Sequence, residues 1–207
     1  PACELNVASE EHGKSVEDGL ELMETMRTSG ITFGNIHSYC ALLHGCARAA
    51  GPDERAAYGE KAIKILRMMA DANVEPDKEA YGHVVTACAR SGMLFRSVDL
   101  LRQMADLNMA PSRSLFNLVV DTCVREAQTG NSIAMELGVR VLKIMREAGV
   151  AADAVRCFAL MDSPYVGEWC THCRLKIFKV LQEMGTEESA VMEARRILEK
   201  YDAVLDP

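Results

Sequence analysis

The sequence has few of the residues that interrupt helices or build strands. Only 6 of its 207 residues are Pro and 5% are aromatic, whereas helix formers such as Ala, Leu, Met, Glu and Arg are abundant. It also lacks any apolar run of about 18 residues, so we expect no transmembrane helix. Positive charge is in deficit: the net charge of −7 and the pI near 5.3 argue against a protein that coats nucleic acid with a basic surface. A local basic stripe on an acidic body is compatible with these values.

No signal or transit segment is visible, and the first residue is Pro rather than Met. We therefore expect a processed or trimmed chain, and the missing presequence does not argue for the cytosol. The eight Cys occur without the framework of a small disulfide-rich domain. This usage is typical of reduced thiols in a cytosol, matrix or stroma.

An eight-residue pattern recurs along the chain: small, apolar, any, apolar, apolar, any, any, Met. The copies are GLELMETM (19–26), AIKILRMM (62–69), SVDLLRQM (97–104) and GVRVLKIM (138–145). A fifth segment, IFKVLQEM (177–184), keeps the apolar and Met positions but has Ile177 at the small position. The final Met residues lie 43, 35, 41 and 39 residues apart. Within each octet, the spacing of the apolar positions places an apolar stripe on a helix, and the small residue lets a neighbouring helix approach closely.

A helix end is predicted after each Met. The segments MADANVEPD (69–77) and MADLNMAPS (104–112) share an Asn and a Pro at equivalent places. The residues four positions after the Met tolerate the left-handed backbone that ends helices; they are Gly30, Asn73, Asn108 and Gly149. Pro76 and Pro111 then prevent the helix from continuing.

A second kind of helix precedes each octet, with an aromatic residue, a Cys and a closing Arg. The copies are YCALLHGCAR (39–48), YGHVVTACAR (81–90) and FNLVVDTCVR (116–125). Because Cys46, Cys88 and Cys123 recur at one position, we interpret them as small core residues rather than metal ligands or redox groups. The segments 51–59 and 126–132 are predicted loop insertions between paired helices, and helices are also predicted over 3–13 and 187–205.

Such helix pairs bury their apolar stripes only by stacking. The sequence therefore predicts an all-α fold, a right-handed α-solenoid of stacked antiparallel helix pairs in one domain. Its predicted parts are a partial first repeat (1–35), three repeats (36–77, 78–112 and 113–153), a degenerate repeat (154–184) and a C-terminal capping helix (185–207).

The unit 78–112 resembles the pentatricopeptide repeat family. It has the family's 35-residue length, with Tyr81 near the start, Gly92 between the helices, Met104 in the second helix and Pro111 before the final residue. The tetratricopeptide repeat fits less well, because that family prefers Ala near the end of its second helix and opens with a Trp-Leu-Gly motif that is absent here. The insertions mark the chain as a divergent member, and the resemblance implies an organellar one; it is carried by 36–153 and extends to 3–35 and 154–184.

The resemblance implies binding of single-stranded RNA in mitochondria or chloroplasts, about one base per repeat. In the family, a residue early in the first helix and the last residue of the repeat select the base. Carried over, these pairs are Asn117 with Asp153, Cys40 with Asp77, and Gly82 with Ser112. The pair Asn117–Asp153 resembles the family's uracil-preferring combination, whereas the other two match no well-defined code.

The resemblance also implies residues that flank the bases and cations that approach the phosphates. The flanking positions hold His37, Glu79 and Ser114, although the family favours apolar residues there. The cations are Arg48, Arg90 and Arg125, which we expect to line up along the concave face. A cation at a helix C-terminus is equally explained by the helix dipole.

The segment CTHC (170–173) is the remaining candidate for a metal site. A structural zinc site needs four ligands, and the sequence has no second CxxC pair, so we expect a loop-to-helix junction and no metal. No Gly-rich phosphate loop, HExxH motif or nucleophile with His and carboxylate partners is recognisable. We therefore expect neither catalysis, nor a cofactor, nor a small-molecule substrate.

Two functions follow as hypotheses. The first is binding of a short single-stranded RNA segment in the mitochondrial matrix or chloroplast stroma, in RNA processing, stability or translation. The alternative is a structural scaffold subunit of a large organellar assembly, such as a ribosome or a membrane protein complex, that uses the solenoid for protein contacts. The acidic balance, the incomplete code and the insertions favour the alternative, whereas the close match of the best repeat, 78–112, to the family favours RNA binding, which we take as the first hypothesis.

Overall fold

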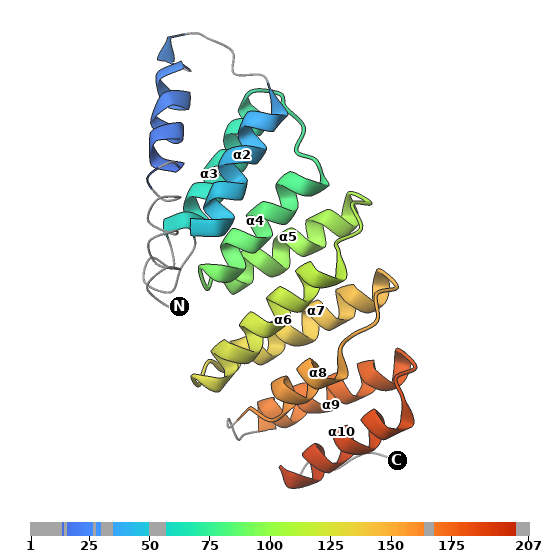
Figure 1. The fold of residues 1–207 in the computed structure, drawn as a ribbon. Helices are drawn as coiled ribbons and strands as arrows, with labels where there is room; N and C mark the ends of the chain where they lie inside the picture. The colour runs from blue at the N-terminus through green and yellow to red at the C-terminus, as the bar shows by residue number, and fades with distance from the viewer. Residues whose placement is uncertain are drawn as a thin grey trace. The chain divides into compact units, whose positions relative to one another are not determined.

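The computed structural model describes residues 14, 16–26, 28–29, 35–49, 57–163 and 168–201, and every regular element among them is a helix (Figure 1). Residues 16–26 are helical, and the helices that follow are α2 (Ile36–Ala49), α3 (Ala57–Asp71), α4 (Lys78–Arg90), α5 (Leu94–Asp106), α6 (Arg113–Gln128), α7 (Ser132–Glu147), α8 (Ala154–Met161), α9 (Glu168–Glu183) and α10 (Glu188–Lys200). The predicted helix over 3–13 lies outside the described residues. No described helix has the length and apolar character needed to cross a membrane.

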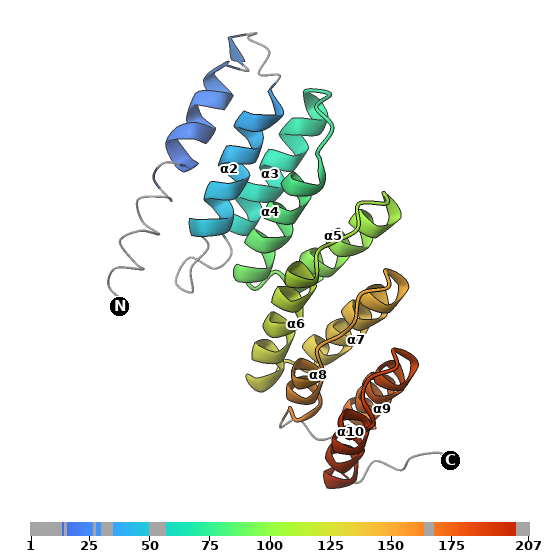
Figure 2. The same cartoon turned by 45° about the vertical axis from the view of Figure 1, so that its right-hand side comes forward.

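The chain forms two compact units, Pro1–Leu100 and Leu101–Pro207, with the boundary inside α5. In the first unit α2 packs against α3 and α4, and α3 also packs against α4 (Figure 2). In the second unit α6 packs against α7 and α8, α7 against α9, and α10 against both α8 and α9. Within each unit, helix pairs therefore stack through their apolar faces, and the predicted α-solenoid class is confirmed.

The predicted helix ends after the Met residues are confirmed where the structure describes them. Asn73 and Asn108 have positive φ angles of 53° and 57°, and Gly149 has 67°. The next amide then donates to the carbonyl of the Met five residues earlier, from Val74 to Met69 at 2.9 Å and from Met109 to Met104 at 2.8 Å. This is the Schellman closure of a helix. Gly30 lies outside the described residues.

The predicted register of the fifth octet is wrong by three residues. The turn that ends α9 has Gly185 at φ 64°, and the Thr186 amide donates to the Leu181 carbonyl at 3.4 Å. Leu181 therefore occupies the position of the Met residues in the other octets. It is fully buried, whereas Met184 is partly exposed. The fifth octet is RLKIFKVL (174–181), which lies 36 residues after its predecessor.

The corrected register places Arg174 at the position that is small in the other octets. At Gly138, the equivalent in α7, an added Cβ would collide with the side chain of Leu160 in α8, so the helices approach closely there. Arg174 is instead a fully buried long side chain. Its guanidinium donates to the main-chain oxygens of Met161 and Ser163, both at 2.8 Å.

The length of α8 explains the space that Arg174 fills. α8 has 8 residues, whereas α4 has 13 and α6 has 16. Because α8 stops early, its terminal carbonyls lack the partners that a further helical turn would provide. The Arg174 guanidinium donates to one of these carbonyls, that of Met161, and to the carbonyl of Ser163 in the segment after the helix; it also stacks over the Tyr201 ring at 3.8 Å. A buried cation thus provides a hydrogen bond that a further turn of α8 would otherwise supply.

The recurring thiols lie in the core, as predicted. Cys46, Cys88 and Cys123 are fully buried, and burial raises the pKa of each to about 12. Cys170 and Cys173 of the CTHC segment are also buried and lie within α9, so the helix begins before the segment. Within the described part of the chain, no group of three or more His, Cys, Asp or Glu is arranged to hold a metal ion.

The two predicted loop insertions are shorter than expected. α3 already begins at Ala57, and α6 continues to Gln128. The reason is burial, because Tyr58 and Ala127, which both lie in the predicted loops, pack into the core. Residues 51–56 lie outside the described part of the chain.

Candidate nucleic-acid interface

The last residues of the three predicted repeats all act as helix N-caps. The Asp77 carboxylate accepts from the Ala80 amide at 2.8 Å, and the Ser112 hydroxyl accepts from the Leu115 amide at 3.3 Å. The Asp153 carboxylate accepts from the Val155 amide at 3.0 Å. These bonds satisfy amides that have no partner in the first turn of α4, α6 and α8. Sequence reasoning missed this role, although Ser or Asp directly before a helical segment is its usual signal.

The partner residues in the first helices occupy one structural position. Cys40, Gly82 and Asn117 are each the fifth residue of their helix, α2, α4 and α6, and all are half-buried. An added Cβ at Gly82 would meet no atom within 4 Å, so this position opens onto free space. The Oδ1 atom of Asn117 is enclosed and makes no hydrogen bond with any described residue.

The structure brings together members of two of the predicted pairs to different extents. Burial raises the pKa of the Cys40 thiol, and the negative charges of Asp77 and Glu79 raise it further, so Asp77 lies within electrostatic reach of Cys40. Asn117 and Asp153 both belong to the second unit, on α6 and at the start of α8, which pack against each other. Gly82 and Ser112 belong to different units.

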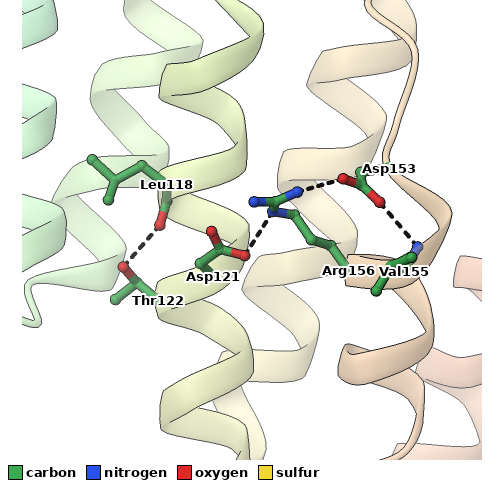
Figure 3. Close-up of polar contacts among 6 residues, drawn as sticks. All are labelled: Leu118, Asp121, Thr122, Asp153, Val155 and Arg156. Carbon is green, nitrogen blue, oxygen red and sulfur yellow. Dashed lines mark hydrogen bonds and ion pairs between the residues drawn. The ribbon is translucent and has the colours of Figure 1, made fainter.

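An arginine that sequence reasoning did not single out joins α8 to α6 (Figure 3). Arg156 donates from Nε to Oδ1 of Asp121 at 2.7 Å and from Nη1 to Oδ2 of Asp153. The hydrogen bond to Asp121 is the main reason that the pKa of Arg156 is raised. Both oxygens of the Asp153 carboxylate are thus engaged, one by the Val155 amide and one by Arg156.

Beside this cluster lies a shallow groove of about 430 Å³ between α6 and α8. It is lined by Asp121, Val124, Asp153, Val155, Arg156 and Ala159. Val155 is 72% exposed and follows Asp153 by two residues, as Glu79 follows Asp77 and Ser114 follows Ser112. In α8 the position equivalent to those predicted to flank a base is therefore apolar. The lining of the groove therefore combines charged side chains with apolar ones.

The three predicted phosphate-contacting cations have different surroundings. Arg48, Arg90 and Arg125 are all exposed at the ends of first helices. Arg90 donates from Nη1 to the Ala47 carbonyl at 2.8 Å, which ties α4 to the end of α2. Arg125 lies 4.0 Å from the Glu126 carboxylate. Arg48 and Arg90 belong to the first unit and Arg125 to the second.

Two histidines of the first unit lie close together, one on α2 and one on α4. The rings of His44 in α2 and His83 in α4 are 5.1 Å apart, and Nε2 of His83 lies 3.6 Å from the Glu79 carboxylate. Burial lowers the pKa of His83, the neighbouring His44 lowers it further, and Glu79 opposes both effects. His37 and Glu79, predicted to flank bases, are exposed.

The fold and these positions define an all-helical repeat protein of the α-solenoid class. Residues 64–126 match the family model of the pentatricopeptide repeat domain. Residues 64–126 therefore carry pentatricopeptide repeats, and the resemblance inferred from the sequence is confirmed.

Two solved structures have a similar fold. One is the PPR domain of Arabidopsis thaliana protein-only RNase P 1 (PRORP1) in complex with tRNA, with a TM-score of 0.59 and 17% identity over 96% of each chain. The other is nuclear proteinaceous RNase P 2 (PRORP2) from A. thaliana, with a TM-score of 0.62 and 15% identity. That match covers 99% of this chain and 43% of the other. A search of curated protein sequences found no match.

Proposed function

We propose that this protein binds a short single-stranded RNA segment in an organelle, the mitochondrial matrix or chloroplast stroma, and acts in RNA processing, stability or translation. The pentatricopeptide match over residues 64–126 carries the proposal. The similar domain of protein-only RNase P 1 was crystallised in complex with tRNA, which supports RNA as the ligand class for this fold.

The second unit provides the best-equipped base site. Asn117 presents an amide on α6, Asp153 presents a carboxylate before α8, and the exposed Val155 offers an apolar surface to the face of a base. A carboxylate accepts the N3–H that uracil carries and cytosine lacks, so this site favours uracil. Cys40 with Asp77 and Gly82 with Ser112 select bases less strongly, because a thiol is a poor partner and Gly has no side chain.

Arg48 and Arg125 are the cations best suited to phosphates, because both are exposed at helix ends. Arg90 contributes less, since its guanidinium already donates to Ala47. So few cations on an acidic protein produce weak binding that salt readily disrupts.

The test measures the affinity of the purified protein for oligouridine and oligocytidine RNA over a series of salt concentrations. We expect tighter binding of oligouridine, and we expect Arg125→Gln to reduce the slope of log K against log salt by about 0.7. Arg196→Gln on α10, a residue that is 81% exposed, is the matched control and should leave the slope unchanged. Absence of binding at low salt, or an unchanged affinity for oligouridine in Asn117→Ala, would contradict the proposal.

We also propose that the chain acts as a binding module rather than as a catalyst. The thiols whose pKa burial raises to about 12 support this reading, because Cys46, Cys88 and Cys123 are buried in the core, where no substrate reaches them. Labelled tRNA incubated with the protein and Mg²⁺ should remain intact over hours. Cleavage that scales with protein concentration would refute a purely binding role.

A scaffold role in an organellar assembly is the second candidate. It is favoured by a groove of about 460 Å³ between α8 and α10, whose lining includes the apolar residues Phe158, Ala159 and Ile197. Lys200, which also lines this groove, is paired with Asp162 at 2.6 Å, and this pairing leaves less positive charge to attract a phosphate chain. Co-sedimentation with ribosomal subunits at high salt, where RNA binding through phosphates is lost, would favour this role. A tagged protein localised outside organelles would refute the organellar part of both proposals.

A further inference from the structure

Arg156 occupies a position at which α4 and α6 bury an apolar residue and α2 has the half-buried Ser38. Three residues after the N-caps Asp77 and Ser112 lie Ala80 and Leu115, both buried. Three residues after Asp153 lies Arg156, whose side chain is 32% exposed and turned toward α6. Core packing therefore does not account for this arginine, and its role must come from its polar partners.

The partners of Arg156 are two carboxylates on either side of the groove. Its Nε donates to Asp121 on α6, and its Nη1 donates to Asp153 at the start of α8. Asp153 also accepts from the Val155 amide, so each of its oxygens already has a donor. The carboxylate of Asp77 caps α4 in the same way, but the corresponding position there is Ala80, which has no charge to offer.

We propose that Arg156 is a specificity-determining residue that holds the Asp153 carboxylate away from the RNA base. This inference rests on the proposed function. To accept the N3–H of a uracil at full strength, Asp153 must release the guanidinium, so the ion pair competes with the base. Arg156 thereby weakens the preference of the Asn117–Asp153 site for uracil.

The effect of this competition on the affinity for uracil is expected to be small. An ion pair between partly exposed side chains contributes little interaction free energy. This contribution corresponds to about a 1.5- to 5-fold change in an equilibrium constant. Removal of Arg156 alone would also leave two uncompensated carboxylates near the RNA phosphates. A charge-neutral pair of substitutions avoids this problem, because Asp121→Asn cancels the charge lost in Arg156→Met.

The experiment compares the wild-type protein with the double variant Asp121→Asn/Arg156→Met in binding to oligouridine and oligocytidine RNA. We expect the double variant to bind oligouridine about 1.5- to 5-fold more tightly and oligocytidine with unchanged affinity. Adding Asp153→Asn to the double variant should remove the gain. Arg156→Lys keeps the charge but cannot donate to Asp121 and Asp153 with the planar geometry of a guanidinium, so it should give a smaller gain in affinity for oligouridine. Thermal unfolding verifies that each variant is folded.

The salt dependence of binding shows whether Arg156 restrains the Asp153 carboxylate or contacts an RNA phosphate. If Arg156 neutralises a phosphate in the complex, the slope of log K against log salt falls by about 0.7 in the double variant. That result, or an equal or lower affinity for oligouridine, overturns the inference while leaving the proposed function in place. An unchanged slope with a gain restricted to oligouridine supports it. If neither protein binds any RNA at low salt, the proposed function itself fails, and the inference fails with it.

Discussion

The Arg90 guanidinium donates a hydrogen bond from Nη1 to the main-chain oxygen of Ala47 at 2.8 Å. Ala47 lies in the last turn of α2, where carbonyls have no partner within their own helix. Arg90 is the last residue of the next first helix, α4. One of the three cations predicted to contact phosphates therefore also ties two successive first helices together.

This contact predicts that Arg90 and Arg48 differ in their effect on stability. Arg90→Ala should lower the free energy of unfolding by about 1–2 kcal/mol, because a charge-assisted bond is lost and the Ala47 carbonyl loses its donor. Arg48→Ala, at the equivalent exposed position of α2, should change it by less than about 0.5 kcal/mol. Urea denaturation followed by circular dichroism measures both. Equal effects would show that the bond to Ala47 contributes nothing.

Arg174 should be among the most sensitive residues in the second unit. Arg174→Met keeps much of the volume but removes the donors to the Met161 and Ser163 carbonyls. We expect a loss of about 2–4 kcal/mol, since buried carbonyls without partners are costly. The buried cation carries its own desolvation cost, which is why the pKa of Arg174 is lowered. Arg196→Met on the exposed side of α10 is the control, and a loss no larger than that of the control would refute this role for Arg174.

Two helical glycines should respond to alanine in opposite directions. At Gly82 an added Cβ meets no atom within 4 Å, so Gly82→Ala should stabilise α4 by about 0.5–1 kcal/mol through helix propensity alone. At Gly138 the same Cβ collides with the side chain of Leu160, which is fully buried and must shift within the packed core. Gly138→Ala should therefore destabilise by about 1–3 kcal/mol. Paired thermal melts test the contrast, which is wrong if both substitutions shift the melting temperature in one direction.

The buried thiols predict a loss of stability at alkaline pH. Burial raises the pKa of Cys46, Cys88, Cys123 and Cys157 to about 12 from the model-compound value of 9.0. Between pH 9 and 12 the folded chain thus holds protons that the unfolded chain releases. Stability is fully present below about pH 9 and falls as pH rises, by up to about 1.4 kcal/mol per pH unit for each thiol.

The measurement is a set of urea titrations at pH 8, 9 and 10, and the control is Cys123→Ala. This variant should lose less stability between pH 9 and pH 10 than the wild-type protein, because one titrating thiol is absent. A wild-type unfolding free energy that is unchanged up to pH 10 would contradict the prediction. Iodoacetamide labelling at pH 8 provides a second check, since these thiols should react only after unfolding.

The helical repeat could be predicted because its signals are local. The octets, the left-handed Asn73 and Asn108 and the first-helix Cys positions each depend on residues within one helix or one turn. The register of the last octet was predicted wrongly although a local signal was present, because Gly185 follows Leu181, not Met184, by four residues. Leu181 and Met184 are both apolar and lie three residues apart, so they share a helix face and satisfy the same pattern. Only the Gly185 turn and the burial of Leu181 distinguish them.

The candidate site, like the repeats, was predicted only in part from the sequence. The repeat alignment alone located Asn117 and Asp153, because the phase of the repeat determines which residue opens a helix and which precedes the next. It did not show that Asp77, Ser112 and Asp153 cap the helices that follow them. The involvement of Arg156 was also missed, because it bonds Asp121, which lies 35 residues earlier in the chain.

The sequence by itself determined the helix pairs, their apolar faces and the family to which the repeats are similar, because periodicity and helix-end chemistry act over a few residues. The tertiary structure alone decided what the charged side chains do. Arg90 bonds a neighbouring helix end, Arg174 bonds the last residue of α8, and Arg156 engages two carboxylates across a groove. Each of these roles depends on which carbonyl or carboxylate packing brings within hydrogen-bond distance, and no local pattern specifies that partner.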